Sequence, residues 1–231
     1  MLEAGQNHLA APLWSGQHPE WFRTLDAEMR ASWDAVPAFS FWLRWWDGVL
    51  SGRQIDWALQ EKVALIPTEI WELGAEAVAK EIARIEEQFR LRREVTRLKG
   101  QLAAVHAEVS SLAIRGHNNP PELVEPVAEV ERQTDALVRA LTEAETELER
   151  EKPRPAVLNR VGRLLREISY KSIAYCASLG DAMLKKGAEE IGSAAAKWLV
   201  RSGAAAIILQ MEEVHTLVRA LAAFAKSLGA G

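Results

Sequence analysis

The sequence predicts an all-α protein. Apolar residues recur at spacings of three and four along nearly the whole chain, and no segment alternates apolar and polar residues over more than a few positions. Eight of the nine tryptophans lie between Trp14 and Trp71, and one strong turn signal, GHNNPP, interrupts the later helical pattern. Three parts are therefore expected. They are a tryptophan-rich head of short helices (1–74), an antiparallel coiled-coil hairpin (75–151) and a basic, then Ala/Gly-rich helical C-terminal region (152–231).

The first two helices of the head are predicted by their boundaries and their aromatic stripes. Pro19 and Glu20 suit the first turn of one helix. Pro37 opens the next helix, and Gly52 ends it. The tryptophans could form a cage for a cation or a base, or they could fill the core of the head. The apolar side chains recur at helical spacing, so we favour the core. These stripes are Trp21, Leu25, Met29 and Trp33, followed by Phe39, Trp42, Trp45, Trp46 and Val49.

Two shorter helices complete the head. Asp56 is expected to cap the N-terminus of a helix over residues 57–66, which stops before Pro67. Thr68 is expected to cap one further turn, which Gly74 closes.

The hairpin begins with one helix over residues 75–115, which would be about 60 Å long at 1.5 Å per residue. Its apolar residues step by three and four up to Phe89 and again from Val95 onward. The seam slips by one position between these two series. We therefore expect a local irregularity near residues 91–95.

The GHNNPP turn occupies residues 116–121 and precedes a second heptad series that ends at Leu148. Residues 76–115 carry eight bases and six acids, whereas residues 116–151 carry three bases and ten acids. Because the two arms differ in charge, we expect the mildly basic first arm to face the acidic second arm in an antiparallel pair.

The C-terminal region combines a basic apolar stripe with small residues and a final amphipathic helix. Small residues permit close helix packing in water or in lipid. The longest apolar run, 203–209, is shorter than the roughly 20 residues of a membrane-spanning helix. The N-terminus lacks the basic segment of a signal peptide. The single cysteine, Cys176, excludes an internal disulfide, lies among apolar residues and favours a cytoplasmic setting.

Several motifs together resemble a group of uncharacterised bacterial proteins. In that group a tryptophan-rich head precedes a helix, a GHNNPP turn and a small-residue C-terminal tail. The resemblance spans most of the chain in pattern, implies a bacterial cytoplasmic origin and assigns no catalytic residues. The motifs besides GHNNPP are Phe41-Trp42, Trp45-Trp46-Asp47-Gly48, Gly52, Asp56-Trp57, Val63-Ala64-Leu65-Ile66 and Trp71-Glu72-x-Gly74.

Sequence signals of catalysis and metal binding are missing. The chain has no Walker loop, GxGxxG, GxSxG, HExxH or CxxC motif, and none of its five histidines are at metal-ligand spacing. We therefore expect no enzyme, metal site or cofactor, with an enzyme of unfamiliar chemistry as a third alternative.

Two polar sites remain candidates for partner binding. Trp45 and Trp46 point in different directions, so one ring is available to a partner, with Arg44 and Arg53 as the nearest cations for a phosphate-bearing ligand. At the tip of the hairpin, His117, Asn118 and Asn119 form either a docking point or ordinary turn chemistry, and we favour the turn.

A basic stripe lies beside the apolar stripe of the C-terminal region. Its members either contact phosphates and anionic lipid or pair with the acidic segment 143–151. The overall charge is −4 and no aromatic residues alternate with the stripe, so pairing is favoured and nucleic-acid binding is disfavoured. The stripe consists of Arg154, Arg160, Arg163, Arg166 and Lys171.

These observations predict a non-catalytic scaffold or adaptor that self-associates through its heptad helices or binds a protein partner. The alternative is an effector that is soluble until triggered and then perturbs a membrane through residues 187–231, in bacterial defence or on a mobile element. Against this alternative stand Lys197, Arg201, Glu212 and Glu213, because each charge costs about 3 kcal/mol near a bilayer centre.

Overall fold

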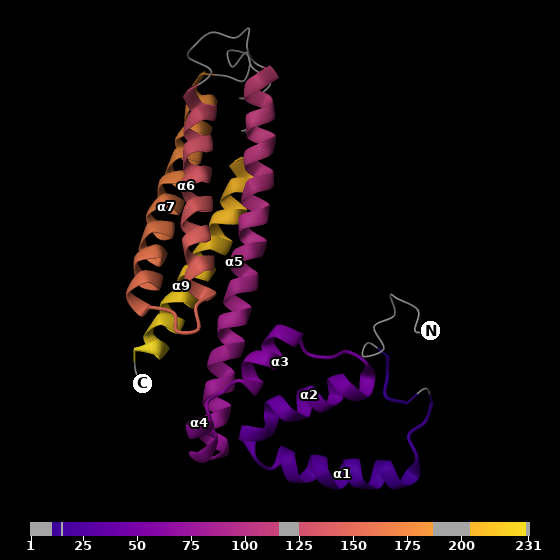
Figure 1. Ribbon diagram of the computed structural model, residues 1–231. Coiled ribbons are helices and arrows are strands. Elements are labelled where there is room, and N and C mark those ends of the chain that lie inside the picture. The colour runs from indigo at the N-terminus through magenta and orange to yellow at the C-terminus, as the bar shows by residue number, and fades with distance from the viewer. Residues whose placement is uncertain (1–10, 15, 116–124, 187–203, 230–231) are drawn as a thin grey trace, which may run out of the picture. The chain divides into compact units, whose positions relative to one another are not determined.

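All regular elements in the described part of the chain are helices, which confirms the predicted all-α class. The computed structural model describes the backbone of residues 11–14, 16–115, 125–186 and 204–229, and the side chains of 11–14, 16–107, 129–178 and 210–229. The elements, shown in Figure 1, are α1 (Glu20–Asp34), the 3₁₀ turn η2 (Pro37–Phe39), α2 (Ser40–Ser51), α3 (Trp57–Ala64), α4 (Thr68–Glu72), α5 (Ala75–Arg115), α6 (Glu125–Leu148), α7 (Pro155–Lys186) and α9 (Ala204–Leu228).

The chain divides into two compact units, Met1–Phe89 and Arg90–Gly231, and the boundary lies inside α5. Apolar side chains of α5 up to Phe89 belong to the core of the first unit, and those from Leu91 onward belong to the core of the second. The predicted slip of the apolar seam thus coincides with the point where the helix changes from one core to the other. The three-part division of the sequence stays a prediction.

Helix boundaries in the first unit largely follow the local signals. The Asp56 carboxylate accepts the backbone N–H groups of Ala58 and Leu59 and so caps α3. Gly52 ends α2 in the left-handed conformation at a φ of 70°. The expected Thr68 cap is wrong, because Thr68 is already the first residue of α4 and no side chain caps that helix.

The apolar stripe expected on α1 is also wrong. Trp21 and Leu25 are 62% and 57% exposed, and the buried aromatic residue is Phe22. Phe22 packs near the ring of Trp46, with 6.3 Å between ring centroids. The face of α1 that contacts α2 is therefore shifted by one residue, and it includes the polar Asp26, which hydrogen-bonds to Trp46.

The core of the first unit is mainly aliphatic, with Phe41 as its one aromatic member and tryptophans at its margin. None of the eight described tryptophans is fully buried, so the prediction that tryptophan fills this core is wrong. An indole ring carries an N–H that needs an acceptor, and such acceptors lie at the edge of a core. The buried residues of this cluster are Phe41, Leu59, Val63, Ile66, Val78, Ile82 and Ile85.

In the second unit, α6, α7 and α9 lie beside the C-terminal part of α5 (Figure 1). Three pairs show that α5 and α6 run antiparallel. They are Arg92–Glu149 at 2.7 Å, Lys99–Glu145, and His106–Asp135 at 3.5 Å. The expected pairing of a basic arm with an acidic arm is confirmed.

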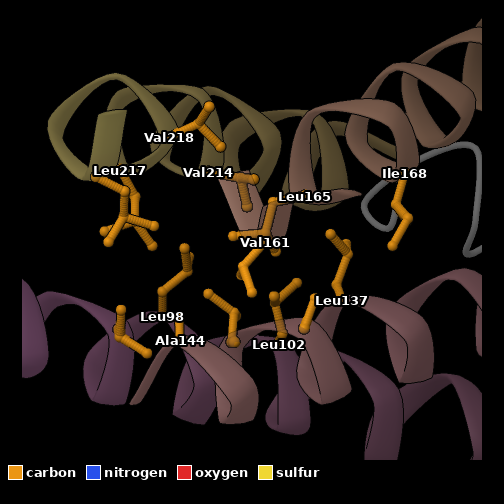
Figure 2. Packing of buried hydrophobic residues seen from close by; sticks show 14 of the residues in the cluster. Leu98, Leu102, Leu137, Ala144, Val161, Leu165, Ile168, Val214, Leu217 and Val218 are labelled. Atoms are coloured by element: carbon orange, nitrogen blue, oxygen red, sulfur yellow. The ribbon is translucent and has the colours of Figure 1, made fainter. Parts of the chain in front are cut away.

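The apolar seams of this pair are covered by the C-terminal helices. Figure 2 shows Leu98 and Leu102 of α5 and Leu137 of α6 pointing toward side chains of α7 and α9. Among the described helices, α7 and α9 share the most extensive contact. All four helices thus share one core, and the C-terminal residues described belong to it. Its labelled members from α7 and α9 are Val161, Leu165, Ile168, Val214, Leu217 and Val218.

Candidate functional site

An apolar pocket of about 370 Å³ lies in the first unit between α2 and α3. Its size falls within the range of small-molecule sites. Phe41, Trp42 and Trp45 line it from α2, and Trp57 lines it from the first position of α3.

Two neighbouring pairs of aromatic rings in the pocket stand nearly edge to face. The planes of Phe41 and Trp42 are 86° apart with 5.1 Å between centroids, and those of Trp42 and Trp45 are 75° apart with 6.3 Å between centroids. Edge-to-face pairs of this kind are favourable because ring edges are positive and ring faces negative. The arrangement holds the rings in different planes around the pocket.

Hydrogen bonds fix the Trp45 side of the pocket. The Trp45 indole N–H donates to the Gln60 amide oxygen at 2.9 Å. The Gln60 amide nitrogen in turn donates to the Ile55 carbonyl at 2.6 Å. Both ends of the Gln60 amide are therefore already engaged within the protein.

The two adjacent tryptophans have different partners, as their sequence positions predicted. Trp45 faces the pocket, whereas Trp46 donates its indole N–H to Asp26 at 2.8 Å and lies against α1. Both rings are half-buried. The expectation that one of them is available to a partner stays a prediction.

The two expected cations do not line the pocket. Arg44 donates to both carboxylate oxygens of Glu86 at 2.9 Å, and its guanidinium carbon lies 5.9 Å from the centre of the Phe41 ring. Arg53 is exposed after the end of α2. The residues predicted for the hairpin tip, His117, Asn118 and Asn119, lie outside the described residues.

The basic stripe is partly used in ion pairs. Arg160 pairs with Glu143, and Arg154 pairs with Glu147 at 2.8 Å, so these two arginines contact the acidic segment as favoured from sequence. Lys171 pairs instead with Glu167 at 2.8 Å on its own helix. Arg163 and Arg166 are exposed.

A second, polar groove of about 610 Å³ lies between α7 and α9 and is lined by Arg166, Tyr170 and His215. Beneath it, Ser169 Oγ lies 2.7 Å from His215 Nε2. Ser169 is fully buried and also donates to the Arg166 carbonyl, so its hydroxyl joins two helices and is not open to a substrate. Sequence reasoning missed this pair because the two residues are 46 positions apart.

The single cysteine and the potential metal ligands are the remaining chemical groups of interest. Cys176 is buried, and burial raises the pKa of its thiol, as expected for a small apolar core residue. No cluster of three or more His, Cys, Asp or Glu side chains suitable for a metal ion occurs in the part of the chain that is described. In that same part, no helix has the length and apolar character needed to cross a membrane.

The chain matches no family model, no curated protein and no solved structure.

Proposed function

We propose that the protein is a non-catalytic adaptor that binds a protein partner through its tryptophan-rich unit. The distribution of exposed apolar side chains carries this proposal. Among the described residues, eight of the ten large hydrophobic side chains that are exposed belong to the first unit. Exposed apolar groups concentrated in one part of a protein mark interaction surfaces.

The contact is centred on Trp21 and Leu25. They lie four residues apart on α1, so their side chains are neighbours on one exposed helix face. Tryptophan is enriched among the residues that contribute most to protein–protein binding. The patch formed by Trp21 and Leu25 therefore supplies apolar contact area and an aromatic side chain that can anchor a partner.

Charge favours a partner with a basic surface around its apolar contact. Residues 1–89 carry 14 acids and 7 bases, a net charge of −7. Complementary potentials steer association, and the same negative charge repels an anionic membrane.

Self-association through the heptad seams receives less support. Leu102 and Leu141 are almost fully buried in the core of their own chain, where α7 and α9 cover the hairpin. The membrane-perturbing alternative stays a prediction. It requires α9 to leave this core, although one face of α9, which includes Met211, Leu217 and Phe224, is buried there.

Site-specific crosslinking in the native cell followed by reconstitution tests the proposal. A photoreactive residue in place of Trp21 is expected to capture one protein. That protein, once purified, should bind the wild-type chain, and Leu25→Asp should weaken binding at least about tenfold, as for a central contact.

Leu164→Asp is the matched control, because Leu164 is also exposed but lies on α7 in the second unit. It should leave the affinity unchanged. A captured protein whose affinity is insensitive to Leu25→Asp, or equally sensitive to both variants, would overturn the assignment of this face.

A further inference from the structure

The pocket between α2 and α3 has the composition of a cation site. Four aromatic side chains line it, together with the carboxylate-bearing Glu61, and its lining contains no basic residue. The faces of indole and phenyl rings attract cations through their negative quadrupole, and tryptophan does so most strongly. Three of the four rings are tryptophans.

The surrounding charge reinforces this preference. Glu61 is exposed at the pocket, and residues 1–89 have a net charge of −7. Arg44 already lies over the Phe41 ring, but its charge is balanced by both oxygens of Glu86. A further cation therefore meets no uncompensated positive charge at the lining of the pocket.

The pocket offers few hydrogen-bond acceptors. The Gln60 amide is engaged at both ends by Trp45 and Ile55. A primary ammonium would have to leave its water shell for a nearly apolar lining, in which the Glu61 carboxylate can accept only part of its hydrogen bonds, and this is costly. A quaternary ammonium has no N–H groups that need acceptors, so removing it from water into the pocket costs less free energy.

We propose that this pocket binds a small quaternary ammonium compound, with the Trp42, Trp45 and Trp57 rings around the cationic head and Glu61 as its counter-charge. The pocket volume leaves room for a short substituent beside the head. The site requires no other protein, so it is independent of the partner proposed above.

Three probes separate the contribution of charge from those of shape and hydrogen bonding. They are choline, its neutral isostere 3,3-dimethylbutan-1-ol, and ethanolamine, whose ammonium is primary. Calorimetry on the full-length protein should show choline binding about tenfold tighter than either of the others. The choline methyl protons should also shift upfield by nuclear magnetic resonance, because they lie against ring faces.

Two variants test whether the ligand binds at this pocket. Each replaces an exposed side chain of the lining, so little effect on folding is expected. Glu61→Gln and Trp57→Ala should each weaken choline binding about five- to tenfold. Glu69→Gln is the matched control, since it removes an exposed carboxylate from α4, outside the pocket, and should leave the affinity unchanged. Circular dichroism checks that each variant is folded.

Two results would overturn the proposal. One is equal affinity for choline and its neutral isostere, which would make the pocket merely apolar. The other is no choline binding at concentrations up to about 10 mM. Either result leaves the partner proposal standing, since crosslinking at Trp21 does not involve this pocket.

Discussion

The indole N–H of Trp46 donates to the Asp26 carboxylate at 2.8 Å and ties α2 to α1. Asp26 also accepts from Arg30 at 2.8 Å, and Arg30 pairs with Asp47 at 2.6 Å. Burial alone would raise the pKa of Asp26, but the hydrogen bonds from Arg30 and Trp46 outweigh it and hold the pKa below its usual range. These four side chains form the polar contact between the two helices.

Removing the acceptor should loosen this pair of helices. Asp26→Ala leaves the Trp46 N–H and the Arg30 guanidinium without their shared partner, so the free energy of unfolding of the first unit should fall by about 2 kcal/mol. Urea denaturation followed by tryptophan fluorescence measures the change. Asp34→Ala, an exposed position on the same helix, should have little effect. Equal losses in both variants would show that the contact with Trp46 does not stabilise the unit.

Two helical glycines should respond in opposite directions to alanine. A Cβ at Gly48 would lie 2.9 Å from the Arg53 carbonyl oxygen, which is backbone and cannot move aside cheaply. Gly48→Ala should therefore destabilise the protein by about 1–3 kcal/mol. A Cβ at Gly100 meets nothing within 4 Å. Gly100→Ala should stabilise α5 by up to about 1 kcal/mol. Chemical denaturation measures the free energy of unfolding of both variants. A stabilising effect of Gly48→Ala would contradict the close approach of the Arg53 carbonyl to residue 48.

Charges introduced into the hairpin seam should unfold the second unit. Leu102 and Leu141 are almost fully buried, so Leu102→Glu or Leu141→Glu removes packing and buries a carboxylate. The free energy of unfolding of the second unit should fall by about 3–5 kcal/mol. The exposed neighbours Ala103→Glu and Thr142→Glu are the controls. Circular dichroism and light scattering together read the outcome. A variant with unchanged stability and a smaller assembly would mean that the seam faces a second chain.

Acid should weaken the second unit through two carboxylates. A hydrogen bond from Arg154 lowers the pKa of Glu147, whose side chain is 3% exposed, and hydrogen bonds from Lys99 and Thr96 lower that of Glu145. A carboxylate whose pKa is lower in the folded than in the unfolded state stabilises the fold at pH values above the unfolded pKa of about 4.3. This stabilisation is lost as the pH falls toward the folded-state pKa. The free energy of unfolding should therefore drop between about pH 5 and 3.

Glu147→Gln tests the origin of that slope. It removes one titrating group, so the dependence of the unfolding free energy on pH should flatten in denaturation experiments at several pH values. Glu151→Gln, an exposed site in the same loop region, should leave the slope unchanged. The explanation fails if the Glu147→Gln slope equals that of the wild type.

Signals that act within a few residues predicted the helices well. The Asp56 cap, the left-handed Gly52 and the unbroken α5 follow from neighbouring residues alone. The pairing of α5 with α6 followed from opposite charge and a connecting turn. The start of α4 was predicted less accurately, because Thr68 is the first residue of that helix and does not cap it.

The candidate pocket could be predicted only in part. The sequence drew attention to Trp45, but the pocket also needs Trp57 and Glu61 from another helix, which only packing brings near it. The Ser169–His215 contact likewise depends on α9 folding back along α7. Such sites have no local signature because their members are distant in sequence.

The sequence by itself determined the helical class, most helix ends and the two oppositely charged arms, because these depend on backbone preferences and charge. Tertiary structure alone decided which face of each helix is buried. Both Trp21 and Phe22 lie on apolar stretches of α1, yet Trp46 and Asp26 select the Phe22 side. The hydrophobic effect is non-directional, so it does not specify which apolar face of a helix becomes buried. The neighbouring helix decides this through the contacts that it offers.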